Sequence, residues 1–288
     1  MTEFQSALDH VHTTLTGLRE QGVELRASAA ALSRLAETPT GRDAPAPCKE
    51  PGRPGPAAET PTEKSGDALF ASEPQRSASA GSKAARLAAL RGPVLACTLC
   101  PHLVKSRTQV VFGVGNPEAE LMFVGEAPGE DEDLQGEPFV GKAGQLLTKI
   151  ISAMGFTRDD VYIGNVLKCR PDMPPGESGN RKPTTVEMQT CLPYLRQQID
   201  IIQPRALVAL GTIAMKGLLG TNEPIGKLRG RWHDFHGIPL MATYHPAYLL
   251  RNQSLTEKRK VWEDMLLVLE HLAKPISEKQ RGFFLSAR

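Results

Sequence analysis

The feature that most constrains the fold is an alternation of short apolar runs and helical patterns in the second half of the chain. Four runs have the length and composition of buried strands: Leu121–Val124, Val161–Val166, Ala206–Leu210 and Ile238–Thr243. Apolar residues at helical spacing follow them over 142–154, 185–202, 212–219 and 255–273. Strands that alternate with helices form a parallel sheet with helices on both faces. We therefore predict a three-layer α/β/α domain around a mostly parallel, four-stranded sheet.

The first 85 residues do not continue this alternation. Residues 1–35 carry apolar side chains at mostly helical spacing, which predicts a helical arm. Residues 36–85 are dominated by Pro, Ala, Gly, Ser, Thr and Glu, with Phe70 as the only aromatic residue. Such a segment buries too little apolar surface to fold, so we predict a disordered linker. The folded domain is expected over 86–275, with a C-terminal tail over 276–288.

Composition sets only broad limits on function. The net charge of +2 permits nucleic-acid binding without proving it. No apolar run approaches the roughly 18 residues that span a bilayer. The first residues also lack the basic-then-apolar layout of a signal peptide. We expect a cytoplasmic monomer that does not bind membranes.

The longest run of informative residues is 125–147, directly after the first apolar strand. Glycine and proline break the strand at Gly125 and at the Pro128-Gly129 pair. An acidic loop follows, and then a helix begins. Pro138, Phe139 and three glycines indicate a shaped pocket rather than a solvated run. The acids of this stretch are Glu126, Glu130, Asp131, Glu132 and Asp133.

Polar side chains also follow two of the other predicted strands. Asn165 stands at the edge of the second strand, and His245 follows the fourth. The carboxyl ends of parallel strands lie at one edge of a sheet. Glu126, Asn165 and His245 are therefore expected to converge there, although they are far apart in sequence.

Four cysteines fall within the predicted domain. Cys97 and Cys100 form a CxxC pair, Cys169 follows a strand and Cys191 lies in a predicted helix. This set suits a tetrahedral zinc ion or an iron–sulfur cluster. A redox CxxC pair with two buried thiols is the alternative. The wide spacing between Cys169 and Cys191 favours a cluster held by separate elements. Cys48 lies in the predicted linker and is expected to be a free thiol.

Several motifs together resemble the family 4 uracil-DNA glycosylases, the bacterial and archaeal enzymes that carry a [4Fe-4S] cluster. They are GEAPG at 125–129, GxPFVGxAG at 136–144, NVxKCRP at 165–171 and HPAxLLR at 245–251. The resemblance covers residues 86–272, and several ordered motifs are far more specific than one. It implies a three-layer α/β/α fold and a cluster on Cys97, Cys100, Cys169 and Cys191.

The resemblance also implies roles at the predicted pocket. A base excised from DNA must leave the stack, and Phe139 would stack on the flipped uracil. Asn165 would pair with uracil N3–H and O4, and Ala127 would line the same subsite. His245 would donate to O2 as charge grows on the leaving base. Glu126, or else Glu132, would orient the attacking water.

Contacts to DNA are predicted around the last motif. Leu249 or Leu250 would fill the gap left by the flipped base, and Arg251 would meet a phosphate. Further candidates for phosphate contacts are Lys168, Arg170, Arg181, Lys182, Arg229 and Arg231.

The sequence departs from the family pattern between its third and fourth cysteines. The stretch PDMPPGESGNR, which ends at Arg181, looks longer than usual. It also lacks the Arg-Arg-Ile-His type of insertion of a related branch that bonds covalently to uracil, so we expect turnover.

We therefore predict a monofunctional uracil-DNA glycosylase that acts on single- or double-stranded DNA. No lysine is obviously placed as a Schiff-base nucleophile, so no lyase step is expected. The N-terminal arm would recruit a repair or replication protein. One alternative is a non-catalytic iron–sulfur nucleic-acid binder of the same fold. Another is a hydrolase that holds Mg²⁺ in the acidic loop.

Overall fold

A six-stranded sheet forms the centre of the folded domain. The computed structural model describes residues 81–174 and 176–285; the predicted helical arm and the linker up to residue 80 lie outside them. The strand order is β1-β3-β2-β4-β6-β5. The strands are β1 (Val114–Gly115), β2 (Leu121–Gly125), β3 (Tyr162–Asn165), β4 (Ala206–Leu210), β5 (Trp232–Phe235) and β6 (Ile238–Thr243).

The four predicted strands are the parallel centre of this sheet. β2 pairs in parallel with both β3 and β4, and β4 pairs in parallel with β6. The prediction of four strands was wrong in number, because β1 and β5 add antiparallel edges. β1 has only two residues and β5 is only partly buried, so neither leaves an apolar run. A two-residue turn joins β5 to β6 through His236 and Gly237, which both have positive φ as a type I′ hairpin requires.

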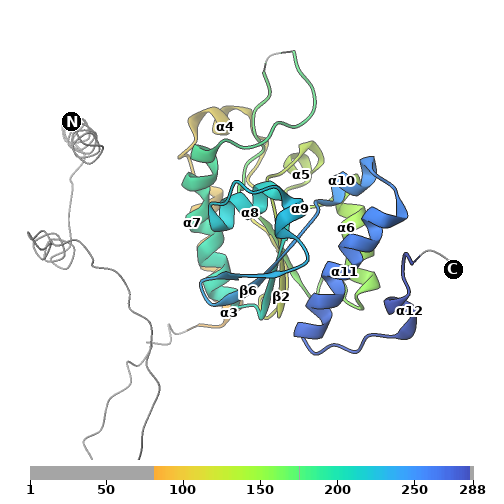
Figure 1. Cartoon of the computed structure of the whole chain (residues 1–288). Helices are drawn as coiled ribbons and strands as arrows, with labels where there is room; N and C mark the ends of the chain where they lie inside the picture. Colours follow the sequence, from red (N-terminus) through yellow and green to blue (C-terminus); the bar gives the residue numbers. More distant parts are fainter. Residues whose placement is uncertain (1–80, 175, 286–288) are drawn as a thin grey trace, which may run out of the picture. The chain divides into compact units, whose positions relative to one another are not determined.

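Helices cover both faces of the sheet, as predicted (Figure 1). The side chains of β2 alternate between two cores: Met122 and Val124 face α3, α7 and α8, while Leu121 and Phe123 face α6 and α11. No helix in the described ranges has both the length and the apolarity needed to cross a membrane. The longer helices are α3 (Lys83–Leu95), α6 (Lys142–Ala153), α7 (Thr185–Ile202), α8 (Thr212–Leu219) and α11 (Leu255–His271).

Several short helices escaped prediction because they are too short to show a periodic pattern. The predicted acidic loop contains one of them, α5. Its first turn holds four acids, which is where the helix dipole favours negative charge. The short helices are α4 (Pro101–Ser106), α5 (Glu130–Gln135), α9 (Ile225–Leu228), α10 (Pro246–Arg251) and α12 (Glu278–Arg281).

The ends of the domain differ slightly from the predicted boundaries. α3 begins at Lys83, three residues before the predicted start. The predicted C-terminal tail packs against α11: the Phe283 ring lies 5.2 Å from the Trp262 ring, centroid to centroid, and Trp262 Nε1 donates to the Gln280 carbonyl at 2.5 Å. Ile276 and Phe283 therefore add to the core over α6 and α11.

Candidate active site and cysteine centre

The candidate site lies where the parallel strands end. From β2 the chain crosses to β3 on one side, and from β3 it crosses to β4 on the other. Connections that diverge in this way leave a crevice at the carboxyl ends of the strands. A cavity of about 440 Å³ lies there, between residues that follow β2, β3 and β6. Its lining includes Glu126, Ala127, Gly129, Glu132, Phe139, Asn165, Asn180, Lys182, His245 and Arg251.

Close packing at the end of β2 fixes two of the predicted residues. A Cβ on Gly125 would stand 2.3 Å from Asn165 Oδ1 and 2.6 Å from the Phe139 ring, so only glycine fits. Phe139 is nine-tenths buried and has a φ of 57°, a conformation that costs energy outside glycine. Arg158 holds it by donating to its carbonyl oxygen at 3.2 Å.

Asn165 is buried with an amide oxygen that has no hydrogen-bond partner among the described residues. Native structures rarely leave such an atom unsatisfied, because its desolvation costs about 1–3 kcal/mol. Since Asn165 lines the cavity, the free oxygen indicates a polar ligand there.

His245 presents one defined face to the cavity. It caps α10, and its Nδ1 accepts the Ala247 backbone N–H at 3.1 Å. The ring proton therefore resides on Nε2. Burial, together with Arg251, lowers the His245 pKa to about 4, so the imidazole is neutral near pH 7. Its ring lies 5.6 Å from that of Phe139, centroid to centroid.

The two candidate acids have different surroundings. Burial raises the pKa of Glu126 to about 7, against the opposing charge of Lys182. The Glu132 carboxylate instead accepts backbone N–H groups from Gly129 at 3.0 Å and from Val140 and Gly141 at 3.2 Å. Glu132 thus holds the turn around the pocket together, which leaves Glu126 as the acid with free capacity.

The predicted DNA-contacting residues of α10 differ in their exposure to solvent. Leu249 is only 4% exposed, which favours Leu250 of the two predicted wedge residues. Leu250 is 38% exposed and remains available. Arg251 is exposed and lines the cavity.

Three of the side chains predicted to contact phosphates are buried or already paired within the protein. Lys168 is 1% exposed. Arg229 pairs with the buried Asp264, Nη2 to Oδ1 at 2.7 Å. Arg181 pairs with Asp172 and with the buried Glu187. Burial withholds Lys168 and Arg229 from a phosphate, while Arg181 lines the cavity with its guanidinium already paired, which residue type alone could not reveal. Lys182 and Arg231 are exposed, while Arg170 is partly buried and donates to the Gly179 carbonyl at 3.0 Å.

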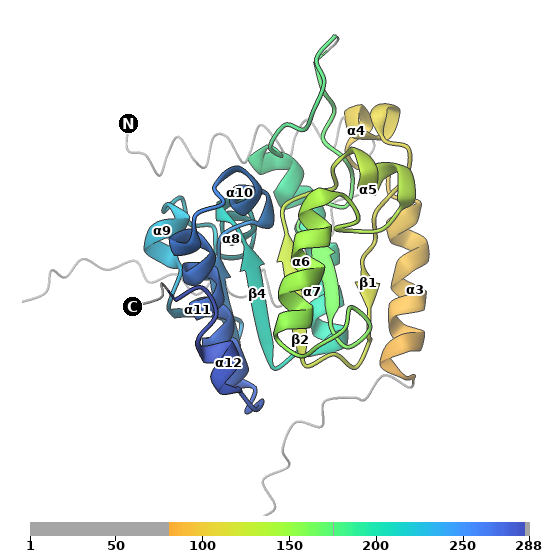
Figure 2. The same cartoon turned by 90° about the vertical axis from the view of Figure 1, so that its right-hand side faces the viewer.

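The sequence did not indicate that the segment between β3 and α7 lines the cavity. This segment extends past the start of α7 (Figure 2) and returns with Asn180 and Lys182 in the cavity lining. Arg181 closes the base of this segment by forming ion pairs with Asp172 and Glu187. His102 Nε2 also lies 2.8 Å from Glu187 Oε1. No period or motif in the sequence carried this information. Lys182, predicted only as a phosphate contact, thus lies in the cavity lining.

The group His102, Asp172 and Glu187 is the only cluster of metal-type ligands found among the described residues, and Arg181 already pairs with both of its carboxylates. The acids of α5 form no such cluster in the described ranges. The structure therefore does not support the alternative of Mg²⁺ in the acidic loop.

The four domain cysteines come together from separate elements. Cys97 follows α3, Cys100 caps α4, Cys169 follows β3 and Cys191 lies in α7. All four are free thiols. Burial, and then the neighbouring Cys169 and Cys97, raise the pKa of Cys100. The thiol groups therefore lie close enough together to affect one another's ionisation.

The sulfurs are spread more widely than a single tetrahedral zinc ion would hold them. A tetrahedral zinc with Zn–S distances of about 2.3 Å would hold sulfurs roughly 3.8 Å apart. No three of these sulfurs lie within 4.8 Å of one another in the described structure. Donors support two of them: Arg107 Nη1 contacts Cys169 Sγ at 3.0 Å, and the Lys168 N–H contacts Cys191 Sγ at 3.3 Å. Burial raises the Cys191 pKa to about 12, and a bound metal would hold this thiol in its ionised form.

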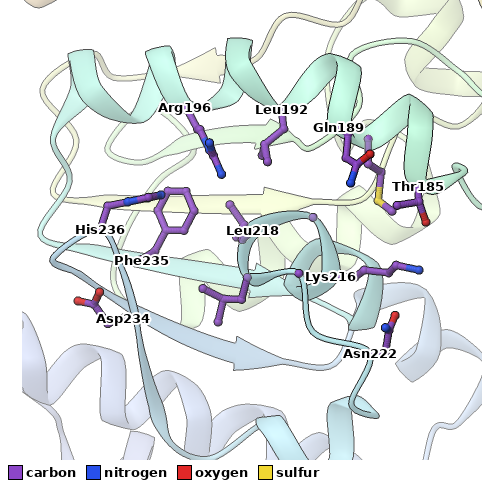
Figure 3. Close-up of a pocket in the computed structure, with 14 residues that line it drawn as sticks. Thr185, Gln189, Leu192, Arg196, Lys216, Leu218, Asn222, Asp234, Phe235 and His236 are labelled. Carbon is purple, nitrogen blue, oxygen red and sulfur yellow. The ribbon is translucent and has the colours of Figure 1, made fainter. Parts of the chain in front are cut away.

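A second hollow of about 810 Å³ lies between α7, α8 and the β5–β6 turn. Figure 3 shows Leu192 and Arg196 reaching from α7 toward Phe235 and Leu218. This hollow contains none of the predicted site residues. Size alone therefore does not identify the site; the convergence of strand ends does.

Comparisons with known proteins agree with this geometry. Residues 112–266 match the family model described as the uracil DNA glycosylase superfamily. The chain is 47% identical to a type-4 uracil-DNA glycosylase of Thermotoga maritima over 172 residues, which cover 59% of this chain and 85% of the relative. A type-4 enzyme of Archaeoglobus fulgidus is 42% identical, over 57% of this chain and 83% of its own. A type-5 uracil-DNA glycosylase of Pyrobaculum aerophilum is 30% identical, over 53% and 79%.

The fold and the match over more than half of the chain define the class, the uracil-DNA glycosylase superfamily. Within it, the chain belongs to the type-4 uracil-DNA glycosylases.

The structural role of Glu132 gives a direct prediction. Replacing Glu132 with alanine leaves three partly buried backbone N–H groups without their acceptor, so we expect a loss of about 2 kcal/mol in the free energy of unfolding. Urea unfolding followed by circular dichroism measures it. Glu130→Ala, at an exposed position of the same helix, is the control and should change stability by less than about 0.5 kcal/mol. Equal effects of the two substitutions would contradict this role.

Proposed function

We propose that this protein removes uracil from DNA by flipping the base into the cavity and hydrolysing its N-glycosidic bond, which leaves an abasic site. This proposal rests on the buried side chain of Asn165, whose amide oxygen has no partner among the described residues, beside Phe139 and His245 at the strand ends. Membership in the type-4 family supports the same reaction. The substrate is proposed to be single- or double-stranded DNA.

Uracil recognition is assigned to Phe139 and Asn165. The ring of Phe139 offers a flat apolar wall on which a base stacks. The Asn165 amide supplies one donor and one acceptor, which match uracil O4 and N3–H. Cytosine presents an amino group and a bare nitrogen at these positions, so it would leave both amide groups mismatched. Ala127 lines the same cavity and leaves room for the base.

Departure of the base is assigned to His245. Negative charge develops on uracil O2 as the glycosidic bond breaks. The Nε2–H of the neutral imidazole is the donor that meets it, and it keeps its proton throughout. Donors placed in this way are worth about 10²–10³ in rate when removed singly.

Attack by water is assigned to Glu126. In its ionised form this carboxylate orients the water and stabilises the positive charge that forms on the sugar. Asn180 lines the cavity beside Gly129 and gives the water a second polar partner. The hydrogen bonds that Glu132 accepts from the backbone make it a supporting residue in this proposal.

The cysteine centre is proposed to bind a [4Fe-4S] cluster through Cys97, Cys100, Cys169 and Cys191. When bound, the cluster joins α3, α4 and α7 to the chain after β3 and thereby stiffens one wall of the site. Hydrolysis of an N-glycosidic bond transfers no electrons, so no residue here is assigned a redox role.

DNA contacts are proposed for the exposed and partly exposed members of the predicted set. Leu250 would enter the gap that the flipped base leaves, and Arg251 and Lys182 would meet phosphates at the cavity rim. Arg170 and Arg231 would extend this contact. We further propose a monomer that acts in the cytoplasm, in keeping with its free thiols. Recruitment of a repair or replication protein through residues 1–35 remains a prediction.

The reaction is tested with a labelled oligonucleotide that carries one central uracil, incubated with the full chain in EDTA and then treated with alkali. We expect strand scission at the uracil only after alkali, because hydrolysis leaves an intact abasic site. Scission without alkali would instead indicate lyase chemistry at Lys182. DNA binding without scission would favour the non-catalytic binder.

The pH dependence of kcat/KM reports the ionisation of Glu126. Because only the carboxylate activates water, activity should rise with pH through about 7, the raised pKa of this group. Lys182 lowers that pKa, so Lys182→Met should move the rise to higher pH. Lys227→Met, away from the cavity lining, is the control. A wild-type rise below pH 5, or a rise that Lys182→Met leaves unmoved, would contradict the assignment.

A further inference from the structure

Lys168 is one of the largest fully buried side chains of the protein, at 1% exposure. Its ammonium lies beneath β3: a Cβ added at Gly164 would meet Lys168 Nζ, Met122 Cε and Leu195 Cδ1, each within 3.9 Å. Lysine is almost never fully buried unless it is paired, because an ammonium is costly to remove from water. A position of this kind requires a specific reason.

The ammonium holds the main chain of the uracil-reading residue. Lys168 Nζ donates to the Asn165 carbonyl at 3.0 Å and to Gln198 Oε1 at 2.5 Å. Gln198 is itself fully buried, and its Nε2 donates to the Phe112 carbonyl at 2.9 Å and the Tyr162 hydroxyl at 3.1 Å. Because Gln198 is anchored in this way, it fixes where the ammonium lies, and the ammonium fixes the end of β3.

The backbone of Lys168 belongs to the cysteine centre. Its N–H contacts Cys191 Sγ at 3.3 Å, its carbonyl accepts the Val111 N–H at 2.8 Å, and the next residue is Cys169. Cys191 and Gln198 lie seven positions apart on α7, which is two helical turns. One helix face therefore contacts both the backbone and the ammonium of the same lysine.

The surroundings of the ammonium lack an anionic partner other than sulfur. Its two hydrogen-bond acceptors are neutral, no carboxylate forms an ion pair with it among the described residues, and the sulfur of Cys191 lies against the backbone of the same residue. Thiolates that hold a metal group are ionised and so supply negative charge at this position. Charge balance and hydrogen bonding thus connect the two sites through one residue.

We propose that Lys168 is a positioning residue that couples the cysteine centre to uracil recognition, with its ammonium holding Asn165 in place and balancing the negative charge of the metal-bound thiolates. The inference rests on the proposed role of Asn165. It gives the metal group a definite connection to the substrate pocket, 
through a side chain that touches neither the substrate nor the metal.

The test compares Lys168→Met, which keeps the length of the side chain and removes its charge, with Lys168→Arg, which keeps the charge. Met122→Leu is the matched control, because Met122 packs at the same point without a polar contact. Each full-length variant is purified, checked by circular dichroism and assayed for iron content. The steady-state kcat and KM on uracil DNA and the reduction potential of the bound cluster are then measured.

We expect Lys168→Met to lose about tenfold or more in kcat/KM, since misplaced recognition groups are costly. Its cluster should reduce at a more negative potential, because a nearby positive charge has been removed. Lys168→Arg should restore the potential at least in part, and Met122→Leu should match wild type in both measurements. If Lys168→Met equals Met122→Leu, or changes only one of the two properties, the coupling is disproved.

A second variant keeps the test decisive if Lys168→Met does not fold. Gln198→Met removes the side chain that anchors the ammonium and leaves the N–H to Cys191 intact. It should lower kcat/KM several-fold and keep the iron content, and an unchanged kcat/KM would overturn the proposal. Failure of the proposed function is a separate result, because wild-type protein would then release no uracil at all.

Discussion

The close approach of three residues at the end of β2 is the contact on which the candidate site depends. Gly125 has no Cβ, so the Asn165 amide and the Phe139 ring can both pack against its backbone. That packing buries the amide, leaves its oxygen without a protein partner and holds Phe139 at a positive φ. A folded protein tolerates the strained backbone of Phe139 and the missing hydrogen bond of Asn165 where both residues serve a binding site.

Topology was the part of the structure that the sequence predicted well. Central strands are continuous apolar runs, and β4 and β6 have the predicted bounds. Once those strands are parallel, Glu126, Asn165 and His245 must meet at one edge, and all three line the cavity. The four cysteines likewise converge as predicted. Edge strands and short helices were missed because their side chains are only partly buried or too few to form a pattern.

Side-chain environment was the part that the sequence could not supply. Lys168 and Lys182 are chemically identical, yet the first is buried under the sheet and the second lines the cavity. Leu249 and Leu250 are neighbours that face opposite surroundings. Glu132 resembles a catalytic acid in sequence, but three backbone N–H groups occupy its oxygens. These distinctions depend on tertiary packing, which no local pattern records.

The most direct measurement of the central claim is excision of uracil by Asn165→Asp, with circular dichroism to verify the fold. The substitution keeps the shape of the side chain and exchanges the amide donor for a second acceptor. If this amide reads uracil, excision should fall by about 10² or more, because O4 would face an oxygen instead of a donor. Excision at the wild-type rate would contradict the account, since the cavity would then recognise uracil without the Asn165 amide.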